Sequence, residues 1–294
     1  SAVGFSAGGE YLATGSFDRT VKIWRTGTWE ETLQLTANQS YVNSIAFSPD
    51  GRLLAAACSN NNAIIWETAN WKIKTTLAKH TSYVNSVSFS SSGDYLITSS
   101  QDKTAVIWKT ASWKDVAMLK EHNDFFGSAS FYPDDRTVLT GSNDGVVKVW
   151  EFRADDIGDD FGKCPFSINS LAFSPDGKYL AASNEDLGEH DNVSVWDVKS
   201  KTKVKLQKGH RASGLSVAFS CDGKYLASYS IDSTVIIWEA KDWVIVKTLQ
   251  LKSWAMSVAF SPDGKYLAVA PGNPYGQPVP VKIWATDKWV EDAS

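Results

Sequence analysis

Seven tryptophan residues recur along the chain at a nearly constant interval, and this period constrains the fold more than any other feature. Each ends a short run of β-branched and apolar residues, such as VKIW, AIIW or VSVW. Successive members are 42, 42, 42, 46, 42 and 46 residues apart: Trp24, Trp66, Trp108, Trp150, Trp196, Trp238 and Trp284. Units of this size bury their surfaces by stacking against their neighbours. The sequence therefore predicts one repeat fold over residues 1–294.

Residues 78–119 show what one unit contains. The runs VNSVSF, YLITSS and AVIW are rich in β-branched and aromatic residues, and turns containing Ser, Gly or Asp bound each of them. The run WKDVAML alternates apolar and polar residues, as a half-exposed strand does. This pattern predicts four-stranded antiparallel sheets that stack radially into a closed ring. The seven units span roughly residues 1–35, 36–77, 78–119, 120–161, 162–207, 208–250 and 251–294.

A second signature repeats with the same period. The turn SPDG follows a Phe in several units, for example after Phe47 and Phe173, and KH or KGH precedes two of the expected first strands. Together with the period and the third-strand Trp, these features resemble the WD-repeat β-propeller family over the whole chain. The WD dipeptide itself occurs only at Trp196-Asp197. The resemblance implies an all-β, seven-bladed β-propeller. It also implies a non-catalytic scaffold that binds protein or peptide partners in a multiprotein complex.

A His, a hydroxyl residue and an Asp recur at fixed distances from three of the tryptophans. These are the residue types of a catalytic triad, but an active site is normally singular, and recurrence in three units favours a structural role. The resemblance implies that the His bridges the Asp and the Ser or Thr, whose hydroxyl meets the Trp N–H. The three predicted networks are His80, Thr98, Asp102 and Trp108; His122, Thr140, Asp144 and Trp150; and His210, Ser228, Asp232 and Trp238.

The first unit keeps Thr14, Asp18 and Trp24 but has no His at the matching position, which would fall before Ser1. This missing partner leads us to expect that the natural chain extends upstream. The first unit also begins at its innermost strand. The ring is therefore expected to close by side-chain packing alone, unless a preceding segment supplies an outer strand.

The sequence offers little for catalysis, metals or cofactors. The four His residues fall in different units, with His190 in an inserted loop, and no phosphate-binding, hydrolase or zinc-protease motif occurs. We therefore expect no catalytic, cofactor or metal residues. The three cysteines are far apart, which favours reduced thiols in a cytoplasmic protein, with the nucleus as the alternative. A net charge of −4 makes nucleic acid an unfavourable partner, and no apolar run is long enough to cross a membrane.

The strongest functional signal is a set of aromatic and amide residues. Aligned repeats place Tyr41, Tyr83, Phe125 and Trp254 just before the first strand, while Phe17 and Ile231 directly precede the loop Asp. The resemblance places both positions at the mouth of the central channel. Aromatic anchors and amides are typical of peptide-recognition surfaces, although such aromatics can instead cap the packing between blades. The predicted partner-binding residues are Phe17, Tyr41, Asn43, Tyr83, Asn85, Gln101, Phe125, Asn143, Asn169, Ile231 and Trp254.

Two further features bear on binding. The insertions EDLGEHDN and PGNPYGQPVP fall between the second and third strands of their units, and the resemblance opens these loops on the channel-mouth face. A row of lysines alternates along an outer strand: Lys199, Lys201, Lys203 and Lys205. Such a row protects an exposed sheet edge from pairing. The alternative functions are docking of an acidic partner, anionic lipid or RNA through this row, and a channel-bound small ligand or an enzyme.

Overall fold

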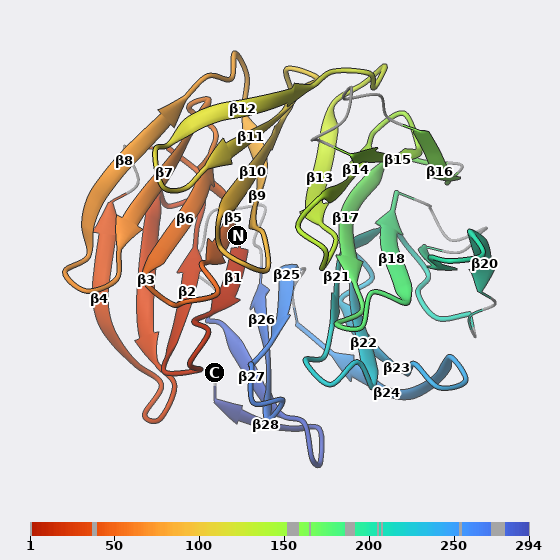
Figure 1. Ribbon diagram of the computed structural model, residues 1–294. Helices are drawn as coiled ribbons and strands as arrows, with labels where there is room; N and C mark the ends of the chain where they lie inside the picture. Colours follow the sequence, from red (N-terminus) through yellow and green to blue (C-terminus); the bar gives the residue numbers. More distant parts are fainter. Residues whose placement is uncertain are drawn as a thin grey trace.

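The computed structural model describes residues 2–36, 40–151, 159–164, 166–185, 192–204, 206, 208–252, 255–271 and 280–293. These residues form seven antiparallel sheets, each built from four consecutive strands, and they contain no helix. Figure 1 shows the sheets arranged around a central axis as the blades of a propeller. This arrangement confirms the predicted all-β, seven-bladed fold.

The strands follow one another without any exchange between sheets. The first three sheets contain β1 (Ala2–Phe5), β2 (Tyr11–Gly15), β3 (Thr20–Arg25), β4 (Glu30–Thr36), β5 (Val42–Phe47), β6 (Leu53–Cys58), β7 (Asn62–Glu67), β8 (Lys72–Ala78), β9 (Val84–Phe89), β10 (Tyr95–Ser100), β11 (Ala105–Lys109) and β12 (Lys114–Leu119). The fourth and fifth contain β13 (Phe126–Phe131), β14 (Thr137–Ser142), β15 (Val146–Glu151), β16 (Asp159–Lys163), β17 (Ile168–Phe173), β18 (Tyr179–Asn184), β19 (Val193–Asp197) and β20 (Thr202–Val204). The last two contain β21 (Gly214–Phe219), β22 (Tyr225–Ser230), β23 (Thr234–Glu239), β24 (Val244–Gln250), β25 (Ala255–Phe260), β26 (Tyr266–Pro271), β27 (Lys282–Ala285) and β28 (Val290–Ala293).

The third sheet matches the sequence pattern closely, since the runs VNSVSF and YLITSS coincide with β9 and β10. Elsewhere the outer strands β4, β8 and β16 end at residues 36, 78 and 163, past the expected unit boundaries at 35, 77 and 161. The period fixes the repeat length but does not show where the outermost backbone pairing stops.

The SPDG turn shows how local chemistry sets the hairpin between a first and a second strand. In the second sheet, Gly51 has φ of 71°, a left-handed conformation that glycine adopts without steric cost. Its N–H donates to the Ser48 carbonyl at 2.9 Å. The Ser48 hydroxyl donates to Asp50 at 2.6 Å, and the same oxygen accepts the Leu53 N–H at 2.9 Å. The turn therefore satisfies its own polar groups and fixes the register of β5 against β6.

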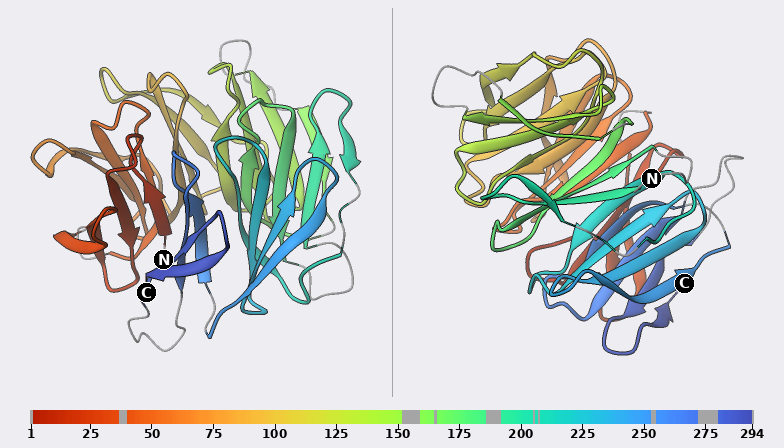
Figure 2. Two further views of the ribbon diagram at one scale, coloured as in Figure 1. Left: turned by 90° about the horizontal axis from the view of Figure 1, so that it is seen from below. Right: turned by 90° about the vertical axis from the view of Figure 1, so that its right-hand side faces the viewer.

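The ring closes through side chains. The first strands of neighbouring sheets contact one another in an unbroken series that includes β1 with β25. Val3 and Leu12 of the first sheet share a buried cluster with Ala268, Ala270 and Ile283 of the seventh. Figures 1 and 2 show both described ends of the chain at this junction. In the described residues, packing between the first and seventh sheets thus holds the ring together.

A second set of tryptophans joins neighbouring blades near the turn between their third and fourth strands. Each of these residues adopts a left-handed φ of 53–59°: Trp29, Trp71, Trp113, Trp243 and Trp289. Four of them meet a Tyr of the preceding sheet edge to face, with ring centroids 4.9–5.8 Å apart. In the pair that closes the ring, Trp29 contacts Tyr266, and its indole N–H also donates to Asp292 at 3.0 Å. These contacts add an outer layer of aromatic packing between sheets.

Candidate functional site

The three His residues of the repeated networks are buried between a carboxylate and a hydroxyl. In the third sheet, His80 Nδ1 lies 2.9 Å from Asp102 Oδ2 and Nε2 lies 2.8 Å from Thr98 Oγ1. Because an ionised carboxylate only accepts hydrogen bonds, Nδ1 donates to Asp102 and the neutral ring accepts the Thr98 hydroxyl at Nε2. The Trp108 indole N–H donates to that same hydroxyl oxygen at 3.0 Å. One chain of hydrogen bonds therefore links a surface loop to the third strand.

The surroundings of this network favour a neutral imidazole beside an ionised carboxylate. Burial lowers the pKa of His80, and this effect exceeds the opposing attraction of Asp102. Burial alone would raise the pKa of Asp102, but the Thr104 hydroxyl, the Thr81 N–H and His80 all donate to it and lower the pKa. His80 is itself buried, so it is placed to orient its neighbours rather than to exchange protons with a substrate.

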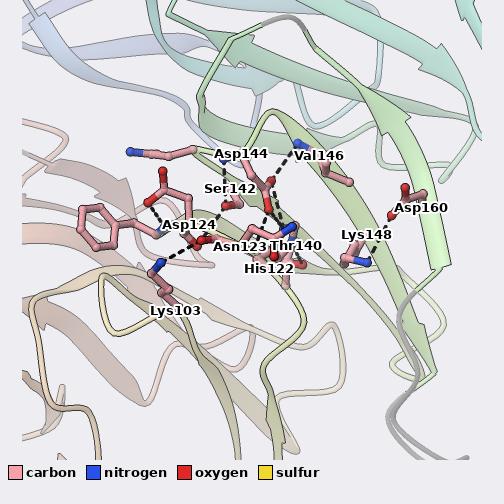
Figure 3. Close-up of polar contacts among 12 residues, drawn as sticks. Lys103, His122, Asn123, Asp124, Thr140, Ser142, Asp144, Val146, Lys148 and Asp160 are labelled. Carbon is pink, nitrogen blue, oxygen red and sulfur yellow. Dashed lines mark hydrogen bonds and ion pairs between the residues drawn. The ribbon is translucent and has the colours of Figure 1, made fainter.

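The same geometry recurs in the fourth and sixth sheets. His122 Nε2 lies 2.8 Å from Thr140 Oγ1, and its Nδ1 lies 3.0 Å from Asp144 Oδ2 (Figure 3). In the sixth sheet, His210 contacts Ser228 and Asp232 in the same way. The indole N–H of Trp150 donates to Thr140 at 2.8 Å, and the Trp238 ring lies 5.9 Å from His210. Three equivalent networks in three blades fit a repeated structural element.

Four large aromatic side chains project into solvent from the first four sheets: Phe17 from the loop between β2 and β3, and Tyr41, Tyr83 and Phe125 from the equivalent loops that precede β5, β9 and β13. Their exposed fractions are high for such residues: Phe17 42%, Tyr41 48%, Tyr83 50% and Phe125 40%. Regular backbone hydrogen bonds hold these loops in place. The carbonyls of Tyr41, Tyr83 and Phe125 accept the N–H of Ser59, Gln101 and Asn143 at 2.9–3.0 Å. We call Phe17, Tyr41, Tyr83 and Phe125 the aromatic arc.

Three asparagines of the predicted surface form hydrogen bonds between neighbouring sheets of the ring. The amide nitrogens of Asn43, Asn85 and Asn169 donate to backbone carbonyls of the following sheet, at Val84, Phe126 and Gly214, over 2.8–2.9 Å. Asn43 also exchanges hydrogen bonds with Ser59. These amides therefore join neighbouring inner strands, and the aromatic arc is the more exposed part of the predicted surface.

The remaining predicted residues are half-buried or outside the described part of the chain. Gln101, Asn143 and Ile231 are half-buried, and their backbone N–H groups bond to the loop before the first strand of the same sheet. Trp254 lies outside the described residues, as do Lys205 and most of both insertions, at 186–191 and 272–279. The side chains of Lys199, Lys201 and Lys203 are exposed, but only Lys203 lies on the three-residue strand β20, and Lys199 and Lys201 lie in the turn before it, so the expected row along an outer strand is wrong for these two residues.

The described residues offer no evident centre for other chemistry. They contain no group of three or more His, Cys, Asp or Glu side chains placed to hold a metal ion. All three cysteines are free, and burial raises the pKa of the Cys58 thiol to about 12. Within the described segments, no helix has the length and hydrophobicity that crossing a bilayer requires.

One exposed residue beside the aromatic arc was not predicted from the sequence. Arg19 follows Phe17 and Asp18 in the loop between β2 and β3, and its guanidinium carbon lies 6.0 Å from the centre of the Tyr41 ring. Its loop position carries a different residue in each sheet, so repetition gave no signal. The clue in the sequence is its place directly after the loop Asp, where it must share the surface with Phe17.

Comparison with known proteins agrees with this architecture. The family model described as "WD domain, G-beta repeat" matches residues 1–25, 29–67, 71–109, 113–151, 162–197 and 201–239. A stretch of 45 residues is 44% identical to part of WD repeat-containing protein 62 of Mus musculus, which covers 15% of this chain and 3% of that protein. The chain thus spans a small part of the length of this relative. With the family model matching most of its residues, the chain belongs to the WD domain, G-beta repeat family.

Proposed function

We propose that this propeller is a non-catalytic scaffold that binds peptide segments or protein partners over the channel-mouth face, with the aromatic arc as its anchor. Propellers of this family are commonly protein-interaction scaffolds. The observation that carries the proposal is the run of four exposed aromatic side chains on four consecutive sheets. Aromatic residues are enriched where binding energy concentrates in protein interfaces, because they bury a large apolar area with few rotatable bonds.

The hydrogen bonding of the buried polar residues supports the proposal that the chain is not catalytic. The His, Asp and hydroxyl groups that could perform acid–base chemistry bond to one another inside three equivalent blades. None of these networks differs from the others in a way that marks a single reaction centre. We also propose a cytoplasmic location, which three free cysteines support.

The aromatic arc can be tested by comparing variants in capture experiments from cell extract. Tyr83→Ala combined with Phe125→Ala should abolish recovery of the partners that the unaltered chain captures, since both rings are lost from the face. The fold should survive, because both side chains are exposed. A melting temperature close to that of the unaltered chain would show this.

Two control variants show whether a loss of capture is specific to the aromatic arc. Val244→Ala with Val246→Ala removes side chains that are 40% and 41% exposed on the outer strand β24, far along the sheet from the channel. This pair should capture partners normally. Replacing Lys201 and Lys203 by Ser tests the alternative that an acidic partner, lipid or RNA docks at β20. If the lysine variant loses the partners while the aromatic variant keeps them, the binding face lies at the sheet edge instead.

A further inference from the structure

Backbone hydrogen bonds at the junction of the first and second sheets bring two exposed aromatic residues, Phe17 and Tyr41, together. The loop between β2 and β3 is closed by the Arg19 N–H, which donates to the Ser16 carbonyl at 3.2 Å. The Val42 N–H, at the start of β5, donates to that same carbonyl at 3.2 Å. Tyr41 directly precedes Val42, so the bond draws the Tyr41 ring to Phe17. The two ring centroids lie 5.5 Å apart at an interplanar angle of 67°.

A glycine makes this approach possible. A side-chain carbon at Gly15 would lie 2.3 Å from Val42 Cγ1 and 2.8 Å from Ile45 Cδ1, both far inside van der Waals contact. The end of β2 in the first sheet can therefore lie against the start of β5 in the second. The aromatic pair is the surface consequence of this close packing, and its geometry is set by buried groups rather than by loop flexibility.

Arg19 supplies a cation beside this pair. Its φ of 74° holds the residue in the left-handed region, and its guanidinium carbon is 6.0 Å from the centre of the Tyr41 ring. Among the described residues, no carboxylate forms an ion pair with it. The adjacent Asp18 instead bonds within its own loop, where its Oδ1 accepts the Thr20 N–H at 3.0 Å and the Thr20 hydroxyl at 2.7 Å.

The equivalent cation in the third sheet behaves differently. Lys103 occupies the same loop position with φ of 65°, but its ammonium group donates to the Asn123 carbonyl of the next blade at 2.8 Å (Figure 3). Lys103 therefore bonds to the next blade, whereas the Arg19 guanidinium has no hydrogen-bond partner among the described residues and can offer its donors to a ligand. The contrast separates a structural cation from one that is available at the same face.

We propose that Phe17, Tyr41 and Arg19 form a recognition site for an acidic segment of a protein partner. An apolar side chain of that segment packs against the ring pair, and a nearby carboxylate pairs with the Arg19 guanidinium. The site rests on the proposed peptide-binding function of the channel-mouth face and specifies the chemistry of its ligand. A planar guanidinium with several donors suits a carboxylate, which it can bind through two parallel hydrogen bonds.

A nucleic acid is the other ligand that rings and a guanidinium can recognise, since bases stack on aromatic side chains and phosphates pair with Arg. The charge of the chain favours the peptide. With a net charge of −4, the chain would repel a strand that carries a charge on every nucleotide far more than a segment with one or two carboxylates. Single-stranded RNA therefore enters the test as a competing ligand.

The test begins with selection from a phage library of random dodecapeptides on the immobilised chain. The unaltered chain should enrich sequences that combine an aromatic or large aliphatic residue with Asp or Glu. Arg19→Gln should remove the acidic bias from the recovered sequences while apolar residues remain enriched. Lys103→Gln, the matched control, should leave the bias in place. All three proteins should melt within a few degrees of one another, because both side chains are exposed and Lys103→Gln removes only one hydrogen bond.

Affinity measurements then locate the contact. A recovered peptide, labelled with fluorescein, should bind about three- to fivefold more weakly to Arg19→Gln, as expected for loss of one exposed ion pair. Phe17→Ala with Tyr41→Ala should weaken it further. Selection of neutral or basic peptides by the unaltered chain, with binding that depends on Tyr83 and Phe125, would overturn this site but leave the proposed function standing. Failure to enrich any peptide would contradict both. Tighter binding of labelled oligouridylate than of any recovered peptide would overturn the acidic-segment assignment.

Discussion

The networks predict a specific stability cost for His80→Ala. The substitution removes a hydrogen bond to an ionised carboxylate, at 2.9 Å, and one to a buried hydroxyl, at 2.8 Å. Bonds to charged groups contribute about 1.5–3 kcal/mol and neutral ones about 0.5–1.5 kcal/mol. Asp102 keeps the Thr81 and Thr104 donors, so its charge stays partly satisfied. We therefore expect a loss of about 2–4 kcal/mol in the free energy of unfolding.

Urea unfolding followed by tryptophan fluorescence measures this loss, which corresponds to roughly 3–7 °C in melting temperature for a chain of this length. Thr81→Ala is the matched control, because Thr81 is exposed and reaches Asp102 only through its backbone N–H. This control should lie within about 0.5 kcal/mol of the unaltered chain. A double-mutant cycle with Thr98→Val should show coupling between the two sites. Equal losses for His80→Ala and Thr81→Ala would refute the structural assignment of the network.

Four further outcomes follow from the same structure. Because burial lowers the pKa of His80 and His122 in the folded state, the unfolded chain binds more protons below pH 6.5, so stability should fall as pH drops from 7 to 5; a flat urea-midpoint profile would contradict this. Asp102 and Asp144 have lowered pKa values, so their contribution should persist above pH 3.8 and disappear as pH falls further. Asn85→Asp should destabilise the ring more than Asn85→Ala, because it replaces the donor to the Phe126 carbonyl with a carboxylate; a neutral effect on unfolding with loss of partner capture would instead place Asn85 in the binding surface. Asp135, in a left-handed turn at φ 56°, accepts the N–H groups of Ser91 and Ser92 of the preceding sheet at 2.6 and 2.9 Å. Both Asp135→Ala and Asp135→Gly should lower the urea midpoint because both lose this contact, and Ala should lower it more because Gly adopts the left-handed φ without strain; the reverse order would count against the left-handed turn.

The sequence predicts the fold well because the relevant signals are local and repeated. Alternation and turn residues place β9 and β10 at their observed bounds, and the period requires neighbouring sheets to stack. The same period places Thr98 on β10, Asp102 in the turn that follows it and His80 in the loop before β9. Their roles could be anticipated because each polar group, once buried, needs one of the others as a partner.

The parts that could not be predicted depend on contacts between sheets. The family resemblance predicts Asn85 near the channel mouth, but not that the Phe126 carbonyl of the next sheet lies 2.9 Å from its amide nitrogen. Likewise, the sequence does not show that Trp71, in its left-handed turn, packs edge to face against Tyr11 of the preceding sheet. For Arg19, the decisive fact is the distance to Tyr41 across a blade junction. The spacing of residues along the sequence does not predict distances between side chains of neighbouring sheets.

Site-directed photo-crosslinking tests the central claim, partner binding over the aromatic arc, most directly. Benzoylphenylalanine is introduced in place of Tyr83 in the aromatic arc and, in a second protein, in place of Val246 on the outer strand β24; both native side chains are exposed. After irradiation in cell extract, the account predicts covalent partner adducts from position 83 and none from position 246. Adducts from position 246 with none from position 83 would contradict it.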